Sequence, residues 1–196
     1  MAKMSGVELK SVKYAVGMEG GFFQGNVYLD GKKIGFYSED GNGGSGWFTG
    51  DRDGAEEKLL DRIREHYRKH PEVNGLQICM TKMTASEYAE KKNAGTLPMT
   101  DFSKEKDTSY ILDVFMGALF DLLEKEKSYK KGVKKGYKAY VSVGYVNVVN
   151  SPVPLDEGFF TNGSPETLAQ IRAEADRKSP ANEVTVYSSA DDFVIK

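Results

Sequence analysis

The sequence predicts an α+β fold in a single domain that spans residues 1–196. Three observations lead to this class. The first forty residues show the short apolar runs of antiparallel strands, later segments carry apolar residues at helical spacing, and the two kinds of segment neither alternate strictly nor separate fully. We therefore expect a mainly antiparallel sheet that begins with an N-terminal three-stranded meander and packs against three or four helices. The polar segment 81–106 is the weak point of this domain.

The meander is predicted from three apolar runs. In the first run, residues 7–16, the parity of the apolar side chains switches near Lys10, which indicates a β-bulge. The other two runs flank Asp30-Gly31, a dipeptide typical of a two-residue hairpin turn. The segment that follows, 41–50, is rich in glycine and is expected to be a loop.

Two helices are expected in the middle of the chain. Asp53 and Glu56 have the spacing of a capping box at the start of the first helix. The second helix runs from Asp107 or Thr108 to about Lys127, and its apolar residues cover most of its circumference. A helix this apolar lies at the centre of a fold or in a homodimer interface, and the sequence allows both.

The remaining elements follow from shorter patterns. Ser164 followed by Pro165 predicts the start of a third long helix, because serine caps helices and proline suits their first position. One or two helical turns are expected at 86–92, strands at 76–80, 137–148 and 183–188, and a loop at 151–163.

Composition excludes several classes of protein. The single cysteine, Cys79, excludes a disulfide framework within one chain and a zinc site with two or more thiolates. Lys and Arg number 27 against 29 Asp and Glu, and this net charge of −2 excludes a globally basic nucleic-acid coat. The most apolar stretch, 110–123, is shorter than the about 20 residues of a membrane span. With one thiol and no visible secretory signal, a reducing cytoplasm is the expected location.

Motifs for catalysis, cofactors and metals are weak in this sequence. Residues 41–46 match GxGxxG literally, but the preceding strand belongs to a hairpin and the next helix starts several residues later. That context favours a surface loop over a phosphate cradle. His66 and His70 have a metal-binding spacing, but the basic residues around them oppose a cation and favour a solvated helix end. We therefore expect no catalytic residues, no cofactor and no metal.

Two segments are candidate binding surfaces. The aromatic residues of the 41–50 loop either pack on the core, which is the favoured interpretation, or anchor a partner. The segment 125–138 contains seven Lys and one Glu, which indicates either contact with nucleic-acid phosphates or a solvated helix end. The absence of arginine there weakens the case for bidentate recognition. The candidate binding residues are Asn42, Trp47, Phe48, Lys127, Lys130, Lys131, Lys134, Lys135 and Lys138.

Three short segments of the N-terminal third, residues 7–14, 27–35 and 38–44, form a strand, an Asp-Gly hairpin and a glycine-rich turn in that order. In this the chain resembles small uncharacterised proteins of bacteriophages and other bacterial mobile elements. Those proteins often carry a histidine in the glycine-rich turn, where this chain has Asn42. The resemblance implies a phage or prophage source and action in the cytoplasm of a bacterial host cell. Accessory proteins of that origin often bind and block a host protein, including defence systems such as CRISPR effectors.

The sequence thus predicts a non-catalytic phage or mobile-element protein that binds and blocks a bacterial host protein, as a counter-defence, anti-CRISPR-like inhibitor does. The acidic segment 101–124 next to the lysine run makes the charge polarised, which helps to steer a protein partner. The alternative is a nucleic-acid or nucleotide-phosphate binding protein that uses the glycine-rich loop and the lysine segment. An enzyme built from carboxylates or tyrosines that the sequence cannot pair is a third hypothesis.

Overall fold

The structure, a computed structural model, describes residues 1–16, 21–39, 41, 45–70, 83–97, 101–145 and 157–196. Contacts between Cα atoms group the chain into two compact units. Unit 1 comprises Met1–Asn74, Asp101–Glu126 and Phe193–Lys196, and unit 2 comprises Gly75–Thr100 and Lys127–Asp192. The described residues contain four α-helices and two sheets, which confirms the α+β class. The single domain over 1–196 stays a prediction.

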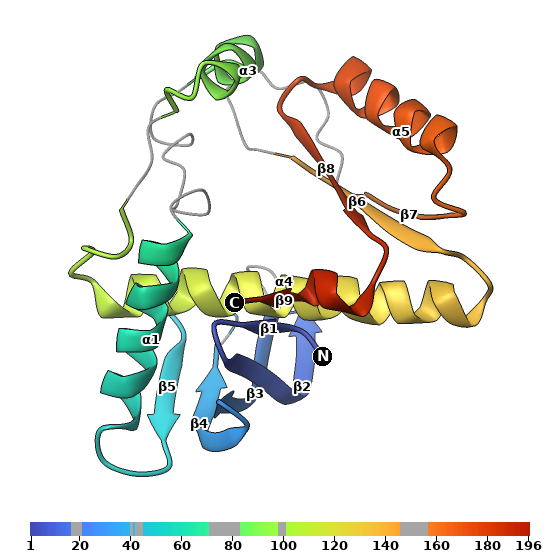
Figure 1. Cartoon of the computed structure of the whole chain (residues 1–196). Helices are drawn as coiled ribbons and strands as arrows, with labels where there is room; N and C mark the ends of the chain where they lie inside the picture. Colours follow the sequence, from blue (N-terminus) through green and yellow to red (C-terminus); the bar gives the residue numbers. More distant parts are fainter. Residues whose placement is uncertain (17–20, 40, 42–44, 71–82, 98–100, 146–156) are drawn as a thin grey trace. The chain divides into compact units, whose positions relative to one another are not determined.

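A six-stranded sheet belongs to unit 1 (Figure 1). Its strands, in the order in which they pair, are β5 (Trp47–Gly50), β4 (Lys32–Ser38), β3 (Gly21–Leu29), β2 (Val7–Val16), β1 (Lys3–Met4) and β9 (Val194–Ile195). Neighbouring strands are antiparallel except β1 and β9, which are parallel. β2, β3 and β4 form the predicted meander. β5 replaces part of the loop that the sequence predicts at 41–50, and the sequence pattern misses the short strands β1 and β9.

Two backbone features of the meander follow from its sequence. The register of β2 against β3 shifts between Lys10 and Lys13, and Ser11 there has a φ of 54°. This irregularity is the predicted bulge. At the next turn, Asp30 and Gly31 have φ values of 50° and 82°, the two positive angles that a type I′ hairpin needs. The bulge and the hairpin are therefore both confirmed.

Helix α1 (Ala55–Lys69) lies beside β5 in unit 1 (Figure 1). The predicted capping box of Asp53 and Glu56 is wrong. Gly54 takes the N-cap position with a φ of 74°, and no side chain caps the helix there. The apolar face of the helix is nevertheless buried, and its largest members are Leu59, Leu60, Ile63 and Tyr67.

Helix α4 (Thr108–Lys134) crosses the strands of unit 1 with its first two thirds (Figure 1). As predicted, the Asp107 carboxylate caps it, accepting a hydrogen bond from the Tyr110 N–H at 3.1 Å. The Phe120 ring stacks on Phe23 of β3 with centroids 4.3 Å apart. The buried apolar side chains of α4 are Ile111, Leu112, Phe115, Met116, Leu119, Leu122 and Leu123. The chain itself covers them, so they do not require a partner helix, and the homodimer stays a prediction.

The C-terminal end of α4 corrects the sequence prediction, which puts it near Lys127. Gly136 has a φ of 91°, and its N–H donates to the Val133 carbonyl at 3.0 Å. The N–H of the following residue donates to the Gly132 carbonyl at 3.1 Å. This pair of bonds is a Schellman motif, which ends a helix at a residue able to adopt a positive φ. Among the described helices, none combines the length and apolar character needed to cross a bilayer.

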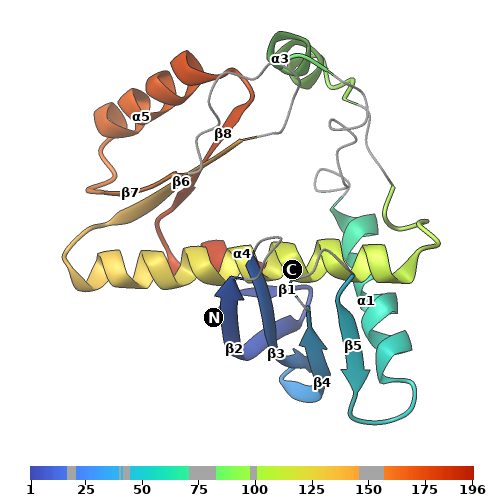
Figure 2. The same cartoon turned by 180° about the vertical axis from the view of Figure 1, so that it is seen from behind.

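Unit 2 contains a three-stranded antiparallel sheet with a helix over one face (Figure 2). The strand order is β7 (Glu157–Thr161), β6 (Ala139–Tyr145) and β8 (Asn182–Tyr187). Helix α5 (Pro165–Lys178) is capped by Ser164 as predicted, and it packs Leu168 and Ile171 on the sheet. The sequence predicts a loop at 151–163, and this prediction is wrong for Glu157–Thr161, which forms β7.

Helix α3 (Ala85–Asn93) is somewhat longer than the turns predicted at 86–92. It starts with a full capping box, in which the Thr84 and Glu87 side chains each accept a hydrogen bond from the other's backbone N–H. This short sequence signal explains why a helix forms in so polar a segment. Outside the described residues lie Cys79, the predicted strand 76–80 and positions 146–148 of another predicted strand.

We predict that Leu119→Ala lowers the free energy of unfolding of unit 1 by about 2–5 kcal/mol, because the side chain is fully buried and leaves a cavity. Denaturant titration followed by fluorescence of Trp47, the single tryptophan, measures this unit. Gly117→Ala is the control. Its added Cβ would meet open space within a helix, so it is expected to raise stability by about 0.5–1 kcal/mol. An unchanged midpoint for Leu119→Ala would contradict the packing of α4.

Candidate binding surfaces

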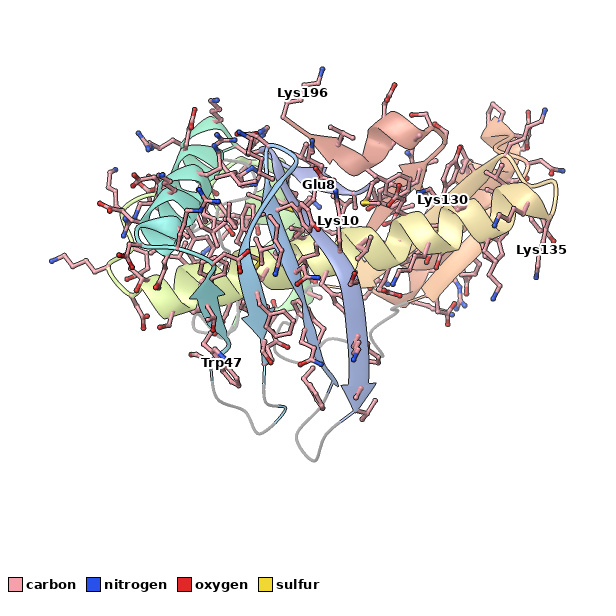
Figure 3. All side chains as sticks on the ribbon, turned by 90° about the horizontal axis from the view of Figure 1, so that it is seen from below. Glu8, Lys10, Trp47, Lys130, Lys135 and Lys196 are labelled. Atoms are coloured by element: carbon pink, nitrogen blue, oxygen red, sulfur yellow. The ribbon has the colours of Figure 1, made fainter. Side chains whose placement is uncertain are left out.

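A surface of six lysines lies on the C-terminal part of α4 and just beyond it, and Figure 3 labels two of its members, Lys130 and Lys135. We call it the lysine surface, and it consists of Lys127, Lys130, Lys131, Lys134, Lys135 and Lys138. Lys130, Lys131 and Lys134 follow Lys127 by three, four and seven residues, which places these four on one side of the helix. All six side chains are exposed. No acidic residue lies between Lys127 and Lys138, so positive charge is concentrated here.

Carboxylates of the described residues do not compensate most of this charge. Within the described part of the chain, four members of the lysine surface make no ion pair, namely Lys131, Lys134, Lys135 and Lys138. By contrast, Lys125 pairs with Asp121 one turn earlier on the same helix. A cluster of like charges without counter-charges raises the local potential and favours an anionic partner.

Two exposed aromatic rings lie at the end of α4 and stack on each other. We call Tyr137 and Phe160 the aromatic pair, whose ring centroids are 5.5 Å apart with 24° between the planes. Tyr137 is 40% exposed and Phe160 is 36% exposed. The Phe160 ring covers Gly132 so closely that a Cβ there would lie 2.6 Å from it. Glycine inside the helix thus allows β7 to approach α4. In the sequence, Tyr137 lies between Lys135 and Lys138 of the lysine surface.

The aromatic pair continues as a row of rings across the sheet of unit 2. Tyr140 on β6 is the register partner of Phe160 on β7 and of Tyr187 on β8. The ring centroids of Tyr140 lie 5.6 Å from Phe160 and 6.3 Å from Tyr187. Side chains alternate along a strand, so this row lies on the face opposite Val141, which packs under α5. Sequence reasoning missed Phe160, because the pattern predicts a loop there.

Strand β5 places Trp47 and Phe48 on opposite faces of the unit 1 sheet. Phe48 pairs with Tyr37 of β4 and is only 9% exposed, so it belongs to the core. Trp47 is 49% exposed at the start of β5, an edge strand (Figure 3). The prediction that the aromatic residues of this segment pack on the core is therefore confirmed for Phe48 and wrong for Trp47. Tyr14 and Val16 are also exposed and lie toward the same end of the sheet, where β2 ends and β5 begins.

Two carboxylates share one phenol between β4 and α4. The Tyr37 hydroxyl oxygen lies 3.1 Å from Glu39 Oε1 and 3.0 Å from Asp113 Oδ1. A hydroxyl has one proton, so it can donate to only one of them. Burial raises the pKa of Glu39, and the charge of Asp113 adds to this rise. Burial and the two carboxylates also raise the pKa of Tyr37. The cluster is therefore best satisfied when Glu39 is protonated.

The last glycine of the GxGxxG match at 41–46 has its backbone N–H bonded within the chain. The Gly46 N–H donates to Asp113 Oδ1 at 3.0 Å. This amide is therefore occupied, and the neighbouring carboxylate of Asp113 would repel a phosphate. A nucleotide-phosphate site at Gly46 is thus disfavoured. Asn42 lies outside the described residues.

His66 is buried in α1, which corrects the solvated helix end that the sequence predicts. Its ring is 0% exposed and contacts the Phe115 ring edge-on. Its Nδ1 lies 2.9 Å from Ser5 Oγ, and His70 Nε2 lies 2.6 Å from the Lys196 carbonyl oxygen. These partners are distant in sequence, so no local pattern could reveal them. In the ranges that the structure describes, no group of three or more His, Cys, Asp or Glu side chains could hold a metal ion.

The candidate residues fall in different units. Trp47 and Phe48 belong to unit 1, whereas the lysine surface belongs to unit 2. No family model, no curated protein and no solved structure matches this chain. We therefore infer its function from its sequence and from the geometry of these two surfaces.

We predict that Glu39→Gln becomes increasingly more stable than the wild type as the pH rises from about 4 to about 8. Since the folded-state pKa of Glu39 is raised, its contribution to stability is full below the unfolded pKa of about 4.5 and is lost as the pH rises through the folded pKa. Gln keeps the hydrogen bonds and cannot ionise. Thermal unfolding of both proteins across this range measures the difference. A constant difference at every pH would show that Glu39 titrates normally.

Proposed function

We propose that this chain is a non-catalytic accessory protein of a bacteriophage or other mobile element, which binds and blocks a bacterial host protein. A counter-defence inhibitor, such as an inhibitor of a CRISPR effector, belongs to this class. The observation that carries the proposal is the exposed side chain of Trp47 on an edge strand. The resemblance of the N-terminal third to phage and mobile-element proteins supports the source.

Trp47 has the properties of an interface anchor. Tryptophan is enriched among the residues that contribute most to the affinity of protein complexes. Its backbone position is fixed, because Trp47 pairs with Ser38 of β4 and the next residue, Phe48, is held in the core. A partner therefore gains the contact without the cost of ordering this segment. Tyr14 and Val16 add exposed apolar surface at the same end of the sheet.

A protein that blocks its partner by occupying a surface needs no catalytic group. Two clusters of polar side chains in this structure could be mistaken for catalytic groups. The Ser5–His66 contact is a serine next to an imidazole, but the buried ring of His66 cannot reach a substrate. The cluster of Tyr37, Glu39 and Asp113 uses its hydrogen bonds to join β4 to α4. We interpret both groups as structural.

We predict that Trp47→Ala lowers the affinity for the host protein by about 30-fold or more, because a tryptophan anchor contributes about 2 kcal/mol or more. Tagged wild-type and variant proteins are used as baits in a bacterial lysate, and captured proteins are quantified by mass spectrometry. The expected result is one stoichiometric host protein that the wild type retains and Trp47→Ala loses.

The matched control is Tyr110→Ala, which removes another exposed aromatic side chain of unit 1, 47% exposed at the start of α4. It is expected to retain the captured protein. Thermal unfolding checks that both variants fold. Equal capture by the wild type and Trp47→Ala would overturn the anchor role, and equal loss in both variants would show a general effect of surface apolar residues.

A further inference from the structure

We propose that the lysine surface and the aromatic pair together bind single-stranded nucleic acid, with lysines on the phosphates and Tyr137 and Phe160 against a base. This activity goes beyond the capture of a host protein, because it uses residues of unit 2, whereas Trp47 belongs to unit 1. It also differs from a site built on the glycine-rich segment, whose Gly46 N–H is already bonded to Asp113.

The charge of the site suits a phosphate backbone. Lys127 and Lys134 are seven residues apart, so the lysines on the helix extend over about 10 Å along its axis. Lys135 and Lys138 continue the charge past the helix end, on both sides of Tyr137 in the sequence. Glu157 is the exposed carboxylate at the start of β7. Because side chains alternate along a strand, it shares a face with Phe159, which packs toward α5, and lies on the face opposite Phe160. Among the described residues, Glu157 therefore does not offset the positive charges of Lys135 and Lys138 next to Tyr137.

The aromatic pair supplies a stacking surface among these charges. Its two rings are nearly parallel and more than one third exposed, and Phe160 is supported from below by Gly132 and from the side by Tyr140. A ring held in this way loses little entropy when a base stacks on it. Positively charged grooves with such rings are typical of proteins that bind single strands, because every base has a π-face.

The combination favours a single strand over a duplex. Bases in a duplex are stacked on each other, so they cannot reach an aromatic ring, whereas an unpaired base can. All six cations are lysines, which act as point charges on phosphates and do not provide the bidentate contacts of arginine to a base edge. We therefore expect binding that depends on salt and on stacking, with little preference for sequence.

The test uses fluorescein-labelled 20-mers of mixed sequence, as single-stranded DNA, as single-stranded RNA and as duplex DNA, with fluorescence anisotropy over a range of salt. The full-length protein is expected to bind a single strand more tightly than the duplex. The logarithm of affinity should fall with the logarithm of salt concentration with a slope of about −0.7 per phosphate contact. The DNA and RNA arms tell which strand is preferred, and either preference supports the proposal.

Two sets of variants separate the charge from the stacking. The quadruple variant Lys131→Glu, Lys134→Glu, Lys135→Glu, Lys138→Glu should lose at least about tenfold in affinity and reduce the salt slope. The charge-matched control reverses four exposed lysines elsewhere, namely Lys13, Lys32, Lys58 and Lys91, and should bind much more tightly than the first variant. Tyr137→Ala should lose about 5- to 100-fold, and Tyr137→Phe should restore binding.

Several outcomes would overturn the proposal. In the first, the wild type gives no change in anisotropy at low salt. In the second, the two quadruple variants bind with equal affinity. In the third, Tyr137→Ala binds as tightly as Tyr137→Phe. Loss of a captured host protein in the first quadruple variant, with no oligonucleotide binding by the wild type, would assign the lysine surface to an acidic protein instead. Trp47→Ala should leave oligonucleotide binding unchanged, so failure of this proposal and failure of the host-protein proposal are distinguishable.

Discussion

The packing of the apolar part of α4 is the interaction on which unit 1 depends. Phe120 stacks between Phe23 and Tyr14, with ring centroids 4.3 and 5.7 Å away, so one side chain holds two strands. Asp113, one turn from the start of the same helix, accepts hydrogen bonds from Tyr37 and from Gly46. The helix thus fixes the end of the sheet from which the Trp47 strand starts, although Trp47 itself does not belong to the core.

The same helix changes its surroundings without a break in its backbone. Up to Glu126 its residues belong to unit 1, and from Lys127 onward they belong to unit 2. The change follows from the sequence, in which apolar residues give way to lysines while helix propensity stays high. The Schellman motif at Gly136 then returns the chain toward the helix, so that Tyr137 lies beside Phe160. One helix can therefore organise a core and also present a charged surface.

Sequence patterns predicted those features that depend on neighbouring residues. The Asp30-Gly31 hairpin, the bulge near Lys10 and the Ser164 cap all follow from local backbone preferences. The lysines of the candidate site could likewise be found from composition. The patterns failed at two local signals, the N-cap at Gly54 and the helix end at Gly136, and they also failed where a distant residue decides the outcome. Phe160 packs on Gly132 of α4, and the buried His66 contacts Ser5, which lies 61 residues away in the sequence. The aromatic pair was missed for the second reason, because Tyr137 and Phe160 are distant in sequence and come together only in the folded chain.

The parallel pairing of β1 with β9 has a consequence for synthesis on the ribosome. Lys3 and Met4 are made before unit 2, whereas their partners Val194 and Ile195 follow the whole of unit 2. β1 therefore remains an unpaired edge of the nascent sheet until β9 leaves the exit tunnel. Such an edge is open to wrong pairing with other chains during that interval. The two segments of unit 2 interrupt unit 1 in the sequence, so the time needed to synthesise them adds to the time that unit 1 stays incomplete.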